Sequence, residues 1–285
     1  MKVLVTGFKG QLGYDVIKVL ESRNILCKGV DLDDFDLTDE KDVSDYVHRY
    51  APTVVIHCAA YTAVDKSEDN KEVSNAVNIS GTENLAKICK EIHAKMMYIS
   101  TDYVFGGTGD RPYEVDDPKN PQSQYGYSKS MGEEKVKEYL SEYYIVRTAW
   151  VFGINGNNFV KTMIRLGKEK EEISVVNDQI GSPTYTFDLA RLLCDMIVTD
   201  KYGIFHATNE GYISWYEFAC AIINEAGLKA KIIPVTSDQF PTKAVRPQNS
   251  RLSKDKLDQS GFERLPAWQD ALKRYIAELN ESNID

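Results

Sequence analysis

The first thirty residues of the chain constrain its fold most strongly. An apolar segment at residues 2–6 predicts a β-strand, and a helical pattern of apolar residues begins shortly after it. Between them lie Gly7, Gly10 and Gly13, at the spacing G-x-x-G-x-x-G. In such a strand–turn–helix unit, glycines permit a sharp turn, a close approach of backbone amides to a pyrophosphate, and tight packing of helix on strand. The unit therefore predicts a dinucleotide-binding turn.

The residues that follow this turn bear on the choice of dinucleotide. A second predicted strand, residues 25–30, ends in Asp31, which is placed to accept hydrogen bonds from an adenosine ribose. A carboxylate there repels a 2′-phosphate, whereas Lys9 inside the turn would attract one. Because these two features oppose each other, the sequence leaves both NADH and NADPH open as the cofactor.

Strand and helix patterns alternate through the first half of the chain. Further strands are predicted at residues 54–57, 96–100 and 144–147, each separated from the next by a helical pattern. Repeated β-α units with short connections predict a parallel sheet with helices on both faces and ligands at the carboxyl ends of the strands. We therefore predict an α/β protein. Residues 1–153 would form a dinucleotide-binding, Rossmann-type doubly wound parallel sheet. Residues 154–285 would form mainly a smaller C-terminal substrate-binding lobe, with some segments returning to the first domain.

Composition narrows the classes of partner. The formal net charge of −9 argues against general binding to nucleic acid or to an anionic membrane, because both favour basic surfaces. The five cysteines are scattered, form no C-x-x-C pair and suggest no metal site, so reduced thiols in a cytoplasmic protein are expected. No apolar run reaches the roughly 18 residues of a membrane span. We therefore expect a cytoplasmic protein whose partner is a small molecule.

Two short runs predict the chemistry. Tyr125 and Lys129 lie four residues apart on a predicted helix, so their side chains share one face. Thr101 closes a predicted buried strand and supplies a hydroxyl group nearby. A free tyrosine has a pKa of about 10, and an adjacent ammonium group is expected to lower the pKa of Tyr125 toward the range useful for proton transfer. A phenol, a cation and a hydroxyl together can deliver a proton to a carbonyl oxygen while a dinucleotide supplies hydride.

These motifs resemble the extended short-chain dehydrogenase/reductases that act on nucleotide sugars. The resemblance is carried by the glycine turn, by the Thr-Asp-Tyr-Val-Phe run at residues 101–105, and by Tyr125-x-x-x-Lys129. Within that group the chain is most similar to the dTDP-4-dehydrorhamnose reductase family, and the similarity extends over nearly all of its length. The additional matching runs are residues 58–65, 147–153, 156–163, 178–184 and 246–252.

The resemblance implies reduction of the C4 keto group of dTDP-4-dehydro-L-rhamnose by NADPH or NADH, giving dTDP-L-rhamnose. It implies that Thr101, Tyr125 and Lys129 are catalytic. With the glycine turn, the expected cofactor-binding residues are Gly7, Gly10, Gln11, Leu12, Asp31, Asp36, Leu37, Ala60, Tyr61, Thr62, Tyr125 and Lys129. The expected substrate-binding residues are Thr101, Asp102, Trp150 and Arg246. Arg246 is included as a diphosphate contact, because an acidic protein needs a local cation to hold an anionic substrate.

Other functions of the same fold remain open at this point. A nucleotide-sugar 4,6-dehydratase would place an Asp-Glu pair after the threonine, but here Asp102 is followed by Tyr103. A 4-epimerase would retain and recycle its dinucleotide. A non-catalytic regulatory subunit would resemble the same family, although the intact tyrosine and lysine pair weighs against it. The sequence leaves monomer and homodimer equally open.

Overall fold

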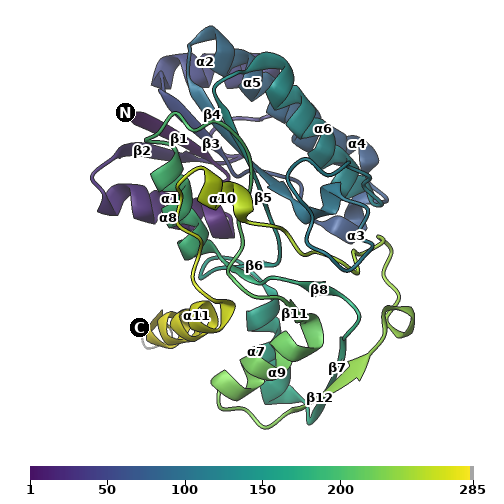
Figure 1. Ribbon diagram of the computed structural model, residues 1–285. Helices are drawn as coiled ribbons and strands as arrows, with labels where there is room; N and C mark the ends of the chain where they lie inside the picture. The colour runs from purple at the N-terminus through teal and green to yellow at the C-terminus, as the bar shows by residue number, and fades with distance from the viewer. Residues whose placement is uncertain (283–285) are drawn as a thin grey trace.

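A computed structural model describes residues 1–282, so the last three residues of the predicted C-terminal lobe lie outside the described part. Its centre is a parallel sheet of six strands in the order β10-β5-β4-β3-β1-β2 (Figure 1). β2 and β3 lie on opposite sides of β1, so the direction of winding reverses between β1 and β3. The strands are β1 Lys2–Thr6, β2 Leu26–Val30, β3 Val54–His57, β4 Lys95–Thr101, β5 Tyr143–Thr148 and β10 Gly203–His206.

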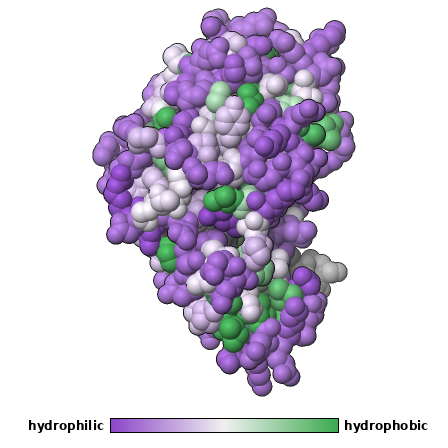
Figure 2. Space-filling view, turned by 90° about the vertical axis from the view of Figure 1, so that its right-hand side faces the viewer, coloured by the Kyte–Doolittle hydropathy of each residue, from purple (hydrophilic) through white to green (hydrophobic). Residues whose placement is uncertain are grey.

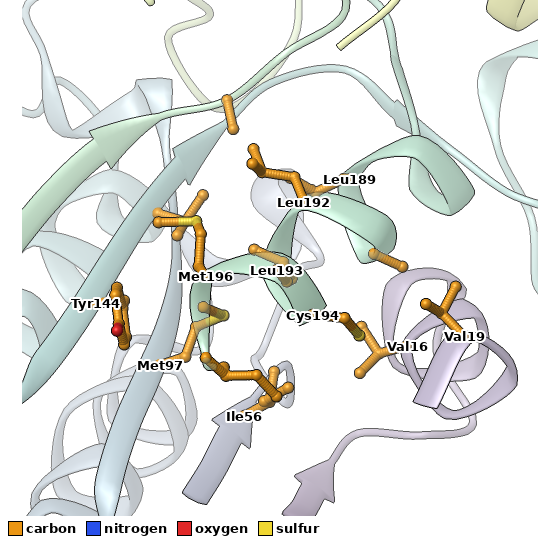
Figure 3. Close-up of a cluster of buried hydrophobic side chains, with 14 of the residues drawn as sticks. Val16, Val19, Ile56, Met97, Tyr144, Leu189, Leu192, Leu193, Cys194 and Met196 are labelled. Carbon is orange, nitrogen blue, oxygen red and sulfur yellow. The ribbon is translucent and has the colours of Figure 1, made fainter. Parts of the chain in front are cut away.

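Helices cover both faces of this sheet. On one face, α1 (Gln11–Ser22) packs beside α8 (Thr186–Met196), and their apolar side chains meet those of the sheet (Figure 3). The other face is covered by α2 (Glu40–Tyr50), α5 (Gly81–Glu91) and α6 (Gln124–Tyr139). The arrangement is the three-layer, doubly wound α/β architecture expected from the sequence.

The strands are apolar on both sides because both sides are buried. In β1, Val3 and Val5 belong to the core under α1 and α8, whereas Leu4 belongs to the core under α2 and α5. The same alternation holds in β3, where Ile56 faces the first core and Val55 the second. Since successive side chains of a strand point to opposite faces, a continuous apolar run is the expected signature of such a buried parallel strand.

A second core lies beyond the carboxyl ends of the strands, in the lower part of Figure 1. It is built on α7 (Phe159–Glu169), α9 (Trp215–Glu225) and α11 (Trp268–Ser282). The strands β7 (Glu172–Val176) and β12 (Lys231–Val235) pair in parallel beside them. The remaining elements are α3 Val64–Ser67, α4 Lys71–Asn75, a π-helical turn Ala76–Ser80, a 3₁₀ turn Asp102–Val104, β6 Val151–Phe152, β8 Ile180–Gly181, β9 Thr184–Tyr185, β11 Ile213–Ser214, a 3₁₀ turn Ser237–Gln239 and α10 Asp255–Gln259.

The two halves of the sequence are interleaved in space. α8 and β10 come from the second half but complete the first sheet, where β10 pairs with β5. The division at residue 153 into a cofactor domain and a substrate lobe stays a prediction. Figure 2 shows a face that is mostly hydrophilic, with hydrophobic residues in small groups. Within residues 1–282, no helix combines the length and the hydropathy of a membrane span.

Candidate active site

A cleft of about 1590 Å³ lies at the carboxyl ends of the strands and continues along the second core. It is larger than the roughly 1,000 Å³ at the upper end for a single small-molecule site, so it has room for a dinucleotide and a second ligand. Every residue that the sequence predicts for the site lines it, although their individual roles stay predictions. They are Gly7, Gly10, Gln11, Leu12, Asp31, Asp36, Leu37, Ala60, Tyr61, Thr62, Thr101, Asp102, Tyr125, Lys129, Trp150 and Arg246.

The glycine turn has the shape that a pyrophosphate requires. Gly7 has a φ of +71°, and a Cβ on it would lie 2.6 Å from the Ala59 backbone nitrogen. A Cβ on Gly13 would lie 2.3 Å from the Gly7 carbonyl oxygen. No side chain caps the N-terminus of α1, which begins after Gly10, so its first backbone N–H groups are free to bind an anion. The turn therefore fits the diphosphate of a dinucleotide.

Gln11 connects this turn to the second half of the chain. Its Oε1 accepts hydrogen bonds from the Gly153 backbone N–H at 2.9 Å and from Asn158 Nδ2 at 3.1 Å. Asn158 also contacts the Tyr275 hydroxyl, at 3.1 Å. The predicted pyrophosphate site is thus fixed on one side by the segment that leads into α7.

The adenosine end of the cleft is acidic. Asp31 accepts hydrogen bonds from the backbone N–H groups of Lys9, at 3.1 Å, and of Leu32, at 3.0 Å, which fix the orientation of its carboxylate. The ammonium group of Lys9 is paired with Asp33. Asp36 accepts hydrogen bonds from the backbone and side chain of the residue two positions later. Of the two opposing features in the sequence, the Lys9 cation is therefore paired with a carboxylate, while the Asp31 carboxylate is held in a fixed orientation at the cleft.

The loop after β3 would face the nicotinamide half of the cofactor. Its middle residue, Tyr61, donates its backbone N–H to Asn78 Oδ1 at 2.8 Å, and Asn78 Nδ2 donates back to the Tyr61 carbonyl at 3.2 Å. Asn78 Nδ2 also donates to Ser128 Oγ on α6, at 2.9 Å. Asn78 is buried in the π-helical turn and joins the loop after β3 to α6. Sequence reasoning missed this residue, because nothing in the local pattern marks it.

The predicted catalytic trio, Thr101, Tyr125 and Lys129, comes from two neighbouring elements. Thr101 is the last residue of β4, and α6 begins one residue before Tyr125. The N-cap residue Ser123 fixes the start of α6 by accepting a hydrogen bond from the backbone N–H three residues later, at 3.1 Å. Lys129 follows one turn later, is buried, and lies 4.0 Å from the ring centroid of Tyr98. The structure therefore brings all three groups to one end of the sheet.

Burial is the main influence on the pKa values of Lys129 and Tyr125. Burial lowers the pKa of Lys129 to about 7, against the opposing effect of the Glu133 carboxylate. Burial also raises the pKa of Tyr125, and the Asp102 charge adds to the rise while a hydrogen bond from Thr101 opposes it. The expectation that Lys129 lowers the pKa of Tyr125 is therefore wrong for this structure, because burial and the neighbouring Asp102 charge both raise that pKa. Tyr125 is held in its protonated form, which is the form that donates a proton.

A buried ion pair joins α6 to β5. Arg147 donates from Nε and Nη2 to the two carboxylate oxygens of Glu133, each at 2.8 Å, and Ser100 Oγ donates to the same carboxylate at 2.6 Å. Arg147 is 2% exposed and Glu133 is fully buried. Glu133 follows Lys129 by one helical turn, so the i, i+4, i+8 spacing from Tyr125 is the signal by which the sequence could have revealed it.

Asp102 lies beside this trio and is also buried. Its Oδ1 accepts a hydrogen bond from Thr101 Oγ1 at 3.0 Å, and its Oδ2 accepts one from Ser250 Oγ at 2.5 Å. Burial raises the pKa of Asp102 to about 6, against the opposing effect of these two hydrogen bonds. A carboxyl group with this pKa changes its charge just below neutrality.

The far wall of the cleft combines aromatic and charged groups. Trp150 has a φ of +51°, and its ring stacks on Trp215 with centroids 3.7 Å apart. Arg246 forms an ion pair with Asp65 at 2.7 Å. Trp215 and Asp65 were not predicted as site residues, and only tertiary packing brings them here. Within residues 1–282, no group of three or more His, Cys, Asp or Glu side chains is arranged to hold a metal ion.

The doubly wound sheet, the glycine turn and the tyrosine–lysine pair define a nicotinamide-dependent oxidoreductase of the short-chain type. The chain belongs to the family described as RmlD substrate binding domain, whose model matches residues 1–281. The predicted family, α/β fold and nicotinamide cofactor class are confirmed.

Several named relatives cover almost the whole chain. The spore coat polysaccharide biosynthesis protein SpsK of Bacillus subtilis is 40% identical over 99% of each chain. The dTDP-4-dehydrorhamnose reductase of Escherichia coli is 37% identical over 98% of each chain. The crystal structure of a Clostridium acetobutylicum dTDP-4-dehydrorhamnose reductase has a TM-score of 0.96 and 44% identity, covering 98% of this chain and 100% of that one. The Bacillus anthracis enzyme, solved in complex with NADP, has a TM-score of 0.95 and 42% identity over the same shares of the two chains.

Proposed function

We propose that the protein reduces the C4 keto group of dTDP-4-dehydro-L-rhamnose and releases dTDP-L-rhamnose. The observation that carries this proposal is the convergence of Thr101, Tyr125 and Lys129 in one cleft that has room for a dinucleotide and a second ligand. The names of the relatives from Escherichia coli and Clostridium acetobutylicum support the same substrate. The nucleotide sugar would bind between the catalytic trio and the Trp150 wall, with Arg246 near its diphosphate.

The geometry supports a division of labour among the catalytic residues. A bound reduced nicotinamide supplies hydride to C4 of the sugar. Tyr125, held as a neutral phenol, donates its proton to the C4 oxygen, so that one hydride and one proton convert the ketone to an alcohol. The Thr101 hydroxyl, whose single hydrogen is donated to Asp102 Oδ1 at 3.0 Å in the structure, would turn to donate it to that oxygen as negative charge develops on it. Lys129 binds the nicotinamide ribose and stabilises the phenolate that Tyr125 leaves behind.

Two alternative enzymatic functions fit the site less well. A dehydratase needs a second acid or base beside Asp102, but the next residue is Tyr103, whose ring packs edge-on against Tyr125 with centroids 5.5 Å apart. Burial raises the pKa of Tyr103 to about 12, so this phenol stays neutral. An epimerase would retain its dinucleotide through turnover, and a non-catalytic subunit would not need the tyrosine and lysine pair.

We propose that residues 1–153 mainly bind the cofactor, that residues 154–285 mainly bind the nucleotide sugar, and that the protein acts in the cytoplasm as a monomer or homodimer. SpsK of Bacillus subtilis is named for polysaccharide biosynthesis, which supports a role in supplying a sugar for cell-surface polymers.

The decisive assay follows nicotinamide absorbance with NADPH or NADH and enzymatically prepared dTDP-4-dehydro-L-rhamnose. A parallel arm uses dTDP-4-keto-6-deoxy-D-glucose, because a Streptomyces niveus relative with 35% identity is named as the reductase of that sugar. Tyr125→Phe should lower kcat by about 100-fold or more, since it removes the general acid. Tyr127→Phe, which alters an exposed tyrosine of the same helix, is the matched control and should retain activity. Equal activity in both variants would remove Tyr125 from this role.

A further inference from the structure

A serine from the C-terminal half reaches the catalytic end of the central sheet. Ser250 Oγ donates a hydrogen bond to Asp102 Oδ2 at 2.5 Å, across 148 residues of sequence. Ser250 is 2% exposed and Asp102 is 4% exposed, so water does not compete for this contact. A short hydrogen bond to a buried carboxylate is among the stronger polar interactions in a protein. The contact therefore has the burial and the geometry to control the orientation of the Asp102 side chain.

The backbone around Ser250 is held without any help from its hydroxyl group. The Ser250 N–H donates to the Ile180 carbonyl at 2.8 Å, and the Ile180 N–H donates to the Gln248 carbonyl at 2.8 Å. The Asn249 N–H donates to the carbonyl of Gly107, in the loop that follows the catalytic strand, at 2.9 Å. Removing the Ser250 hydroxyl should therefore leave the backbone of residues 248–250 unchanged. Any effect of the substitution is then expected at Asp102, which loses a hydrogen bond.

Ser250 is one of two hydroxyl groups that donate hydrogen bonds to the Asp102 carboxylate. The other Asp102 oxygen, Oδ1, accepts a hydrogen bond from Thr101. The phenols of Tyr125 and Tyr103 lie close to the Asp102 carboxylate. Within residues 1–282, no cation forms an ion pair with Asp102. Arg246 donates to the Tyr103 hydroxyl at 3.4 Å and forms its ion pair with Asp65. Two hydroxyl donors, together with the backbone of its own turn, thus take the place of a counter-ion.

We propose that Ser250 is a positioning residue of the active site: its hydroxyl holds the Asp102 carboxylate so that one oxygen stays on Thr101 while the group faces the cleft. The consequence for the reaction rests on the proposed function. Ser250 would keep Asp102 ready to accept hydroxyl groups of the sugar, and it would keep Thr101 in place for the C4 oxygen. Because Ser250 comes from the C-terminal half, the site is complete only when residues 248–250 dock on the end of the sheet.

The first test compares Ser250→Ala with Ser253→Ala, which alters a buried serine of the same segment whose hydroxyl accepts a hydrogen bond from the Asp255 backbone N–H, at 3.4 Å. If the ionised Asp102 binds substrate, kcat/KM should fall on the acid side with the pKa of that group in the free enzyme. Loss of a hydrogen bond that favours the carboxylate should move this acid limb to higher pH by about one unit in Ser250→Ala. Ser253→Ala should leave the limb in place. An unmoved limb in Ser250→Ala would overturn the proposal.

A double-mutant cycle separates positioning from a general structural effect. Asn at position 102 cannot ionise, so Asp102→Asn should remove the acid limb, and adding Ser250→Ala should then change kcat/KM by less than about twofold. A full and independent loss from Ser250→Ala in the Asp102→Asn background would mean that Ser250 does not act through Asp102.

A measurement without substrate keeps this proposal distinct from the proposed function. The carboxyl carbon of Asp102 can be followed by ¹³C NMR during a pH titration of the free protein, with the signal assigned from Asp102→Asn. In Ser250→Ala the midpoint should rise by about one unit relative to the wild type and to Ser253→Ala. A raised midpoint in a protein that reduces neither sugar would support the role of Ser250 and refute the proposed function. An unchanged midpoint would refute the role of Ser250 even if the sugar is reduced.

Discussion

A buried carboxyl group in α1 makes the stability of this protein depend on pH in a defined direction. Asp15 is 1% exposed; its Oδ2 accepts a hydrogen bond from Thr186 Oγ1 at 2.5 Å, and its Oδ1 has no partner within residues 1–282. Burial raises the pKa of Asp15 to about 6, against the opposing effect of Thr186. The folded state therefore binds this proton more tightly than the unfolded state does. The stabilisation is fully present below about pH 4 and is lost as the pH rises through about 6.

The size of this effect follows from the shift. A rise from 3.8 to about 6 is about two units, which corresponds to about 3 kcal/mol between the two protonation states. Asp15→Asn cannot ionise, so its free energy of unfolding should gain on the wild type by about 3 kcal/mol between pH 4 and pH 8. Urea denaturation across this range measures the difference, with Asp110→Asn, in an exposed loop, as the matched control. A difference that does not change with pH would refute the reasoning.

Two further predictions concern the turn and the buried ion pair. Gly13→Ala would place a methyl group 2.3 Å from a backbone oxygen of the turn, so nicotinamide cofactor affinity measured by fluorescence titration should fall about tenfold or more. Gly106→Ala, where a Cβ meets nothing closer than 3.5 Å, should keep its affinity, and equal affinities would contradict the steric argument. Glu133→Gln leaves Arg147 buried without its carboxylate and should lower the free energy of unfolding by about 3–5 kcal/mol in chemical denaturation. A loss below about 1 kcal/mol would show that the buried arginine finds another partner.

The parts of the site that could be predicted from sequence are those encoded by local spacing. Gly7, Gly13 and the Tyr125–Lys129 pair are recognisable because a tight turn and a helical face each need particular residues a few positions apart. Their electrostatics could not be predicted in the same way, because the pKa of Lys129 depends on its burial in the folded protein, which adjacency in the sequence does not report. The sequence showed that Lys129 lies near the Tyr125 phenol, but it did not show that both groups lose their surrounding water on burial.

Residues that reach the site from distant segments carry no comparable signal. Ser250 and Trp215 lie more than 60 residues beyond the last predicted strand of the first half, and each is an ordinary residue type in its local context. The burial of Asp15 also has no signal in the sequence. A single carboxylate in an apolar helical pattern normally indicates a solvent-facing position, but in the structure α8 covers Asp15. Only the three-dimensional pairing of α1 with α8 shows that it is buried.

The interleaving of the two halves explains why the site depends on the whole chain. α8 buries Leu189, Leu193 and Met196 against the sheet, and β10 pairs with β5. Without these two elements the sheet would expose an apolar face and the unpaired edge of β5, both of which favour association over folding. The same half then supplies Ser250 to Asp102. The C-terminal half therefore stabilises the central sheet and completes the polar surroundings of Asp102, so that the predicted cofactor and substrate sites depend on one folded unit.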